Sequence, residues 1–188
     1  MAEVLRIEIP IRKRSMSLDE SRLIVLAKEG DANAFAALLR QHQEMALRVA
    51  FQIVGDWDDA EDVCQESFVK MYRHLGRYQA RHKFSTWLYR IVTHTAIDLL
   101  RRQQRTHRTE LPDDVPVASR EEAMDWQLSL EKVLSELTPK QRSAFVLRDL
   151  QGFPFEEVAE ILDCRGITAR VHLHQARKRL RQRLESER

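Results

Sequence analysis

The chain has 188 residues, of which 31 are Lys or Arg and 29 are Asp or Glu, so that its formal net charge is +2. This length allows one or two small domains with hydrophobic cores of their own. Five glycines, five prolines and the lack of long alternating apolar runs favour an all-α protein. No apolar run approaches membrane-spanning length, and Cys64 and Cys164 lie too far apart to suggest a disulfide framework. We therefore expect a cytoplasmic protein.

Residues 1–16 form an extension ahead of the predicted helices. Isoleucines alternate with polar residues in 7–11, a pattern that suits either a short strand or an extended arm. Met16 precedes a capping-box pattern, with Ser17 followed by Glu20 three residues later, so Met16 is an alternative start of the chain.

Residues 17–105 read as a bundle of amphipathic helices. The first long helix begins at Asp31, whose carboxylate can accept hydrogen bonds from the first turn, and ends at Gly55. The sequence predicts a second long helix with Asp58 as its N-cap and a third that begins at Ser85.

A second helical domain is predicted over residues 122–188, after a flexible linker of residues 106–121 that has prolines and acids but no helical periodicity. Near the C-terminus, two helices follow each other across a tight turn. Pro154 suits the start of the first helix, and Thr168 is placed to cap the second. Asp163 stands in the turn, where its residue type tolerates a left-handed backbone.

The charges are segregated along the chain. Residues 56–66 contain six acidic residues and no basic one, whereas 81–108 contain seven Lys or Arg and one acid, Asp98. The segment after Arg165 is basic again. This pattern predicts a polyanion bound at two places and a basic partner bound between them. A fold held together by internal salt bridges would produce the same blocks.

The last helix carries its basic residues opposite an apolar stripe that includes Leu173, Ala176 and Leu180. A helix-turn-helix presents side chains to the DNA major groove in this way. The alternative is a solvated basic terminal helix.

Five motifs resemble those of the extracytoplasmic-function (ECF) RNA polymerase sigma factors, bacterial transcription-initiation subunits of the sigma-70 family. In the family's order, they lie at 30–35, 59–68, 84–91, 137–142 and 176–180, and the resemblance covers nearly all of 18–184. It implies a region 2 bundle that binds core RNA polymerase and opens the −10 element, and a region 4 helix-turn-helix that reads the −35 element.

The acidic helix resembles the segment that binds the clamp helices of the largest polymerase subunits. The resemblance implies contacts by Asp62, Gln65 and Glu66, supported by Phe68. Asp62 and Glu66 lie one helical turn apart, where both can pair with basic residues of a partner. Without the resemblance, the acids would equally well serve a helix start.

The third long helix resembles the part that recognises and melts the −10 element. His94 falls where relatives often carry Asn beside a pocket for the flipped base, so we expect an altered −10 preference. Arg101, Arg102 and Arg105 are expected to meet phosphates, which add affinity without sequence information. Trp87 is expected in the core of the bundle.

The final helix matches the −35 reader but departs from the family's pattern. The DNA-contacting residues that the resemblance implies are Thr168, Arg170, Val171, His172, His174, Gln175 and Lys178. Relatives commonly have Ser, Arg and Arg where this chain has Val171, His172 and Gln175. Val171 can touch a thymine methyl group and Gln175 an adenine edge. Ala169 replaces a Val, which removes buried methyl groups. Either the −35 sequence is unusual or the helix has lost affinity.

Motifs for catalysis, metal or cofactor binding are lacking, so we expect no enzyme, no metal site and no cofactor. His172 and His174 are two residues apart on a helix and face different sides, which argues against a shared metal ion. Paired acids such as Glu156 and Glu157 are expected on a solvated face.

The resemblance implies three partners: core RNA polymerase, through its clamp helices and flap; promoter DNA; and an anti-sigma factor, either free or membrane-bound. The chain itself is not expected to insert into a membrane. Two alternatives differ in class. One is a sigma-like protein that sequesters an anti-sigma factor without promoter activity. The other is a plain helix-turn-helix regulator, which would leave the acidic helix unexplained.

Overall fold

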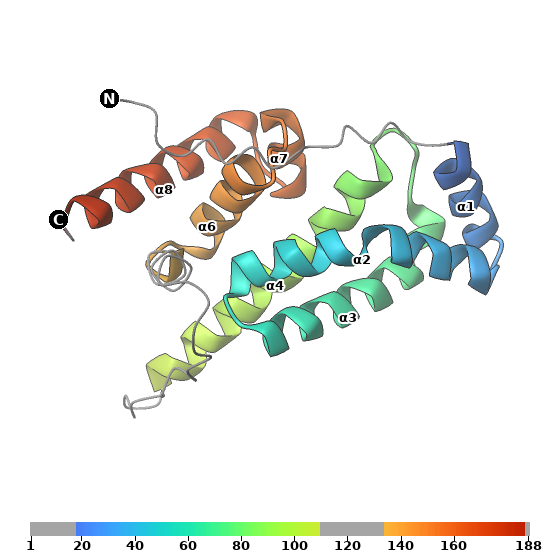
Figure 1. Ribbon diagram of the computed structural model, residues 1–188, viewed down its shortest axis with the longest axis horizontal. Coiled ribbons are helices and arrows are strands. Elements are labelled where there is room, and N and C mark those ends of the chain that lie inside the picture. The colour runs from blue at the N-terminus through green and yellow to red at the C-terminus, as the bar shows by residue number, and fades with distance from the viewer. Residues whose placement is uncertain (1–17, 110–133, 187–188) are drawn as a thin grey trace.

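The computed structural model describes residues 18–109 and 134–186, which form helices and turns without any strand. The N-terminal group of helices is α1 (Leu18–Lys28), α2 (Ala32–Val54), α3 (Trp57–His74) and α4 (Phe84–Thr109). The C-terminal group is α6 (Pro139–Phe145), α7 (Phe155–Ile161) and α8 (Gly166–Ser186). In Figure 1, α2, α3 and α4 run side by side, and α6 to α8 lie along one side of this bundle. The all-α prediction is confirmed.

Helix α2 has the ends that the sequence predicts. The Asp31 carboxylate accepts hydrogen bonds from the backbone N–H groups of Asn33 and Ala34, at 2.8 and 3.1 Å. Gly55 ends the helix at φ 88°, a left-handed conformation that glycine adopts without a steric penalty. A Cβ on Gly55 would also lie 2.9 Å from Nη2 of Arg142.

The predicted N-cap of α3 was wrong by two residues. Asp56, not Asp58, has the extended backbone of an N-cap, and its carboxylate accepts the N–H of Asp59 at 2.9 Å. Asp58 lies in the first turn, where its charge still favours the N-terminal end of the helix dipole. The helix gives way to the 3₁₀ turn Leu75–Arg77.

Helix α4 begins at Phe84 and reaches Thr109, so residues 106–109 continue the helix into the predicted linker. The rest of the linker lies outside the described residues, as do the extension of residues 1–16 and the acidic pair of Glu121 and Glu122, which was also expected on a solvated face.

Helix α6 begins with a capping box, in which Thr138 and Gln141 exchange side-chain to backbone hydrogen bonds around Pro139. Helix α6 runs into the π-helical turn Val146–Leu150. Beyond α7, Asp163 takes the left-handed conformation (φ 51°) that its residue type was expected to tolerate.

Helix α8 begins at Gly166, two residues before Thr168, so Thr168 lies inside the first turn and does not cap it. Pro154 directly precedes α7 as its N-cap residue.

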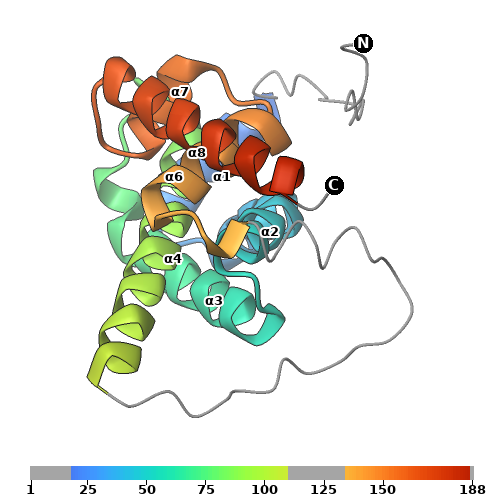
Figure 2. The same cartoon turned by 90° about the vertical axis from the view of Figure 1, so that its left-hand side faces the viewer.

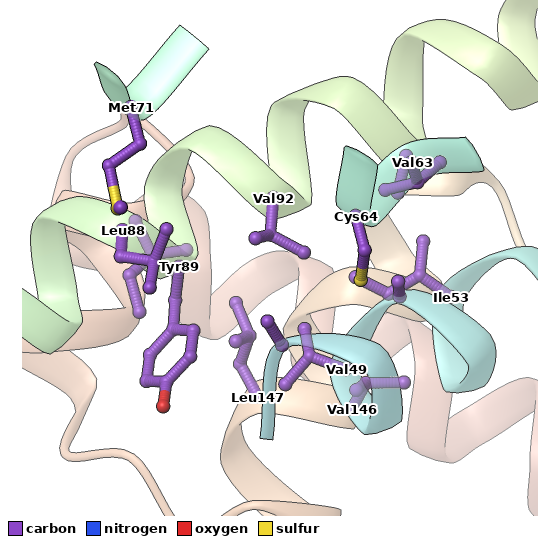
Figure 3. Close-up of a cluster of buried hydrophobic side chains, with 14 of the residues drawn as sticks. Val49, Ile53, Val63, Cys64, Met71, Leu88, Tyr89, Val92, Val146 and Leu147 are labelled. Carbon is purple, nitrogen blue, oxygen red and sulfur yellow. The ribbon is translucent and has the colours of Figure 1, made fainter. Parts of the chain in front are cut away.

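The two domains share one hydrophobic core, which the sequence did not predict. Val146 and Leu147 of the C-terminal domain are fully buried in the same cluster as Val49 of α2 and Tyr89 of α4. Figure 3 shows Leu147 among these side chains, with Val146 beside Val49. The C-terminal domain therefore packs directly on α2 and α4.

Candidate polymerase and promoter interfaces

The predicted polymerase face of α3 is exposed. Asp62, Gln65 and Glu66 point to solvent, and Phe68 is half-buried against the core that holds the helix in place. The side chains expected to meet a partner are therefore free of the bundle interior, while their neighbours Val63 and Cys64 are buried.

Glu66 connects this face with α4. Its carboxylate lies 2.7 Å from Nζ of Lys70 and 3.7 Å from Nη2 of Arg102. The hydrogen bond from Lys70, together with the positive charges of Lys70 and Arg102, lowers the pKa of Glu66. Glu66 is therefore ionised at neutral pH, and the acidic face of α3 adjoins the basic face of α4.

An apolar strip that the sequence analysis did not assign continues the α3 face by another turn. Val69 and Tyr72 are both exposed, Tyr72 to 62%. The Tyr72 ring meets the ring of Phe35 edge-on, with centroids 5.1 Å apart. Val69 follows Gln65 and Glu66 by four and three residues, and Tyr72 follows Val69 by three, so helical spacing places them on the same face of α3.

A cavity of about 290 Å³ lies between α3 and α4, beside His94. Its lining residues are Lys70, His74, Trp87, Arg90, Ile91 and His94. Trp87 packs against Tyr78 and Phe84 while it lines the cavity, so it serves both the core and this surface. An aromatic ring surrounded by cationic side chains is a combination suited to binding an unstacked base and its phosphates.

The three predicted phosphate ligands, Arg101, Arg102 and Arg105, are exposed on the C-terminal half of α4. Arg102 and Arg105 donate to backbone carbonyls one turn back, those of Asp98 and Arg101. This half of α4 extends past the C-terminal domain (Figure 1).

His94 itself is half-buried and does not point freely to solvent. Its Nε2 donates a hydrogen bond to the carbonyl oxygen of Ile161 in α7, at 3.0 Å. The residue predicted to read the −10 element is therefore held by the C-terminal domain.

The recognition helix α8 presents most of its predicted DNA-reading residues. Those exposed are Arg170, Val171, His174, Gln175 and Lys178, whereas Thr168 and His172 are half-buried. Gln175 is partly engaged, because its Oε1 accepts a hydrogen bond from Gln141 at 2.8 Å. Arg170 lies over the ring of Phe155, 5.3 Å from its centroid.

His172 is a neutral side chain at this surface. Burial, with a smaller contribution from the charge of Lys140, lowers its pKa. Its Nδ1 is buried and has no hydrogen-bond partner within residues 18–109 and 134–186. His172 therefore cannot supply the positive charge of the Arg that the resemblance to the family led us to expect there.

Arg177 has a structural partner. It donates two hydrogen bonds to Asp149, at 2.6 and 2.8 Å, and these bonds raise its pKa. A bidentate pair of this geometry fixes α8 against the π-helical turn.

Glu157 corrects the expectation of a solvated acidic pair. Its carboxylate accepts hydrogen bonds from Nζ of Lys83 at 2.6 Å and from Oγ1 of Thr86 at 3.0 Å, and its side chain is only 18% exposed. Its neighbour Glu156 is exposed, as expected.

Among the described residues, no group of three His, Cys, Asp or Glu side chains could hold a metal ion. No helix in this part of the chain is both long enough and apolar enough to cross a membrane. Cys64 and Cys164 are free thiols.

The described residues thus form a helical bundle with an acidic and a basic face, joined to a helix-turn-helix, and the comparisons with known proteins assign this arrangement to a class. The family model for Sigma-70 region 2 matches residues 38–106, and that for Sigma-70, region 4 matches residues 127–180. The ECF RNA polymerase sigma-E factor of Haemophilus influenzae is 30% identical over 184 residues, which cover 89% of this chain and 96% of that protein. The chain belongs to the ECF RNA polymerase sigma factors.

Further relatives agree with this assignment. The ECF RNA polymerase sigma factor SigE of Mycolicibacterium smegmatis is 34% identical over 152 residues, covering 77% of this chain and 59% of that longer protein. Two solved structures share the fold. One is CnrH in complex with the cytosolic domain of CnrY, with a TM-score of 0.69 and 22% identity, and the match covers 90% of this chain and 99% of that chain. The other is the sigma factor RpoE in complex with the anti-sigma factor NepR from Bartonella quintana, with a TM-score of 0.65 and 23% identity, and the match covers 82% of this chain and 98% of that chain. The predicted class, a transcription-initiation factor that works with RNA polymerase and DNA, is confirmed.

Proposed function

We propose that α3 binds the clamp helices of core RNA polymerase and thereby presents α4 to the promoter. The observation that supports this most directly is the junction at Glu66, whose carboxylate lies 3.7 Å from Arg102. The acidic face of α3 and the basic face of α4 adjoin on one bundle. A basic partner bound to α3 would therefore leave the basic face of α4 open to DNA. In this proposal the polymerase carries out RNA synthesis, in the cytoplasm. The chain contributes binding and orientation rather than catalysis.

The −10 element is proposed to meet α4 at the cavity beside His94. Trp87 offers a ring on which an unstacked base can lie, while Lys70 and Arg90 carry charges for its phosphates. Arg101, Arg102 and Arg105 continue the basic surface along the helix and would neutralise further phosphates.

The −35 element is proposed to meet the exposed face of α8. Val171 is 47% exposed and can contact a thymine methyl group, and Gln175 can bond an adenine edge once it releases Gln141. Lys178 would hold a phosphate. Because His172 is neutral, the exposed face of α8 carries less positive charge than the family's pattern implies. We therefore propose that α8 reads an altered −35 sequence rather than binding DNA tightly regardless of its sequence.

We also infer that an anti-sigma factor regulates the chain. Support comes from the likeness in fold to CnrH and RpoE, each solved with a protein partner. The alternative, a chain that only sequesters an anti-sigma factor, keeps this partner but yields no transcripts.

Run-off transcription with core polymerase over a library of genomic fragments tests the proposal. Chain-dependent transcripts that share two spaced elements are expected, and binding to core enzyme without transcripts would favour the sequestering alternative. The double variant Asp62→Arg, Glu66→Arg should lose binding to core enzyme while it stays folded, because both side chains are exposed. A matched control is Glu29→Arg with Glu185→Arg, which makes the same charge change at exposed sites elsewhere. Equal loss in the control would contradict a specific α3 interface.

A further inference from the structure

Two apolar side chains stand on the exposed face of α8. Ile167 is 69% exposed, more than any other large hydrophobic side chain in the described part of the chain, and Val171 is 47% exposed. Because they lie four residues apart in one helix, their side chains are neighbours, one turn apart on the same face. Single exposed apolar residues are common on protein surfaces, whereas adjacent ones rimmed by polar residues mark a binding site.

The pair lies in the middle of the face that α8 turns to solvent. The buried side of the helix consists of Ala169, Leu173, Ala176 and Leu180. From Ile167, steps of four, three and four residues lead to Val171, His174 and Lys178, all of which are exposed. This row runs opposite the buried side. Ile167 therefore shares a row with three of the residues expected to contact DNA, although the sequence analysis did not include it among them.

Polar side chains flank the row on both sides and are held by other helices of the same domain. On one side, Arg170 lies over the ring of Phe155 in α7, 5.3 Å from its centroid. On the other, Gln175 accepts a hydrogen bond from Gln141 in α6 at 2.8 Å. The exposed apolar pair thus stands between one cationic and one amide side chain.

The charge of α8 indicates the class of partner. Residues 164–184 contain seven Lys or Arg and no acidic residue. Such a surface complements a polyanion. Duplex DNA combines dense phosphate charge with apolar methyl groups, which thymine exposes in the major groove. An apolar pair surrounded by cations therefore fits the major groove better than it fits an apolar protein surface.

The position of the pair along the helix also fits contact with bases. In a helix-turn-helix, the N-terminal residues of the recognition helix reach the base edges. Ile167 is the second residue of α8 and Val171 the sixth. Residues four apart are separated by about 6 Å along a helix axis, and neighbouring bases of one strand by about 3.4 Å. The two side chains can therefore meet bases that are one or two steps apart.

We propose that Ile167 is a further specificity-determining residue of α8 and that, together with Val171, it reads two thymine methyl groups one or two base pairs apart in the −35 element. This inference rests on the proposed role of α8 in −35 binding. Thymine is the base whose major-groove edge carries a methyl group. Burial of that methyl group against an aliphatic side chain removes apolar surface of both from water, so thymine is preferred at both positions.

The first measurement shortens the side chains. A promoter recovered from the run-off library, with its −35 element randomised, is transcribed by core polymerase with the full chain. The wild type should select thymine at two positions one or two base pairs apart. Ile167→Ala should lose the preference at one of them, and Val171→Ala at the other.

Both variants should fold, because the two side chains are exposed and alanine favours a helix. The matched control is Val25→Ala, a similar truncation at an exposed position of α1. It should keep both thymine preferences.

The second measurement removes the methyl groups from the DNA. Deoxyuridine, which is thymidine without the methyl group, replaces each of the two selected thymines in turn. Wild-type transcription in competition with the unmodified promoter should fall about fourfold for each methyl group lost, which is the contribution of one buried group of this size. Ile167→Ala should be indifferent to deoxyuridine at its own position and remain sensitive at the position read by Val171. A wild type indifferent to deoxyuridine at both positions would overturn the inference.

The outcomes separate this inference from the proposed function. A wild type without any base preference in the −35 element would refute the role of α8, and the inference with it. Selected −35 bases that Ile167→Ala leaves unchanged would refute the inference alone. If that variant also binds core polymerase more weakly, the apolar pair belongs to a protein interface instead.

Discussion

The chemistry of His94 is set by one nitrogen. Nε2 lies 3.0 Å from a carbonyl oxygen, which only accepts hydrogen bonds, so Nε2 carries a proton. When a base replaces the Ile161 carbonyl, the same N–H can face a base acceptor, but the ring cannot offer a donor and an acceptor in the side-by-side arrangement of an amide. This difference bears directly on base choice.

The variant His94→Asn should therefore change the base preferred at one position of the −10 element and leave the −35 preference unchanged. Selection of active promoters from a randomised library, transcribed with core polymerase, measures both elements together. The −35 element is the internal control. If the variant and the wild type prefer the same bases throughout the −10 element, His94 does not take part in reading it.

Cys64 is a buried free thiol. Burial, with a smaller contribution from the charge of Glu61, raises its pKa to about 12. At pH 8 only about one thiol in ten thousand is then ionised, and the thiolate is the reactive form. Burial also raises the pKa of Cys164.

We predict that neither thiol is a redox sensor. At pH 8 the native chain should react with iodoacetamide far more slowly than the chain in urea, in which both thiols are exposed. Mass spectrometry of the two alkylated sites checks this result. Rapid labelling of Cys64 in the native chain would contradict it.

At the scale of the helix, the sequence predicted both ends of α2 but not the N-cap of α3. The structure confirms Asp31 as the N-cap of α2 and Gly55 as its C-cap. Before α3, however, Asp56, Asp58 and Asp59 compete. Only the backbone conformation selects Asp56, which has φ −131° and ψ 141°, and the sequence does not show that conformation.

A matched pair of variants tests this assignment. Asp56→Ala should lower the free energy of unfolding by about 1 kcal/mol, because it removes the cap hydrogen bond to Asp59. Asp58→Ala should cost only about 0.3 kcal/mol, because it removes a favourable charge near the helix start. Urea unfolding followed by circular dichroism compares the two, and a larger cost for Asp58→Ala would reverse the assignment.

At the scale of the whole molecule, the sequence indicated the faces but not their arrangement. The exposed acids of α3 and the basic residues of α4 and α8 followed from helical periodicity, which needs only local sequence. The pairing of Glu157 with Lys83 joins residues 74 positions apart. The segregated charge predicted an external polyanion, with internal salt bridges as the alternative, and the structure shows salt bridges between the domains.

The shared core has a consequence for stability. Val49 and Tyr89 of the N-terminal bundle are buried partly by Val146 and Leu147 of the C-terminal domain. A chain cut to residues 17–109 would expose those side chains to water, and full burial of one such side chain contributes about 1.5–3 kcal/mol. The truncated bundle should therefore unfold at least about 2 kcal/mol more easily than the full chain.

Thermal and urea unfolding of the two chains, followed by circular dichroism, measure this difference. The full chain should unfold in a single transition, because its core is continuous across the domains. The truncated bundle should show a lower midpoint, and addition of a separate 134–188 fragment in excess should raise it, since a partner that binds only the folded state stabilises it. Two transitions in the full chain, with the bundle's transition unchanged by truncation, would show that the domains fold independently and that the interface contributes little stability.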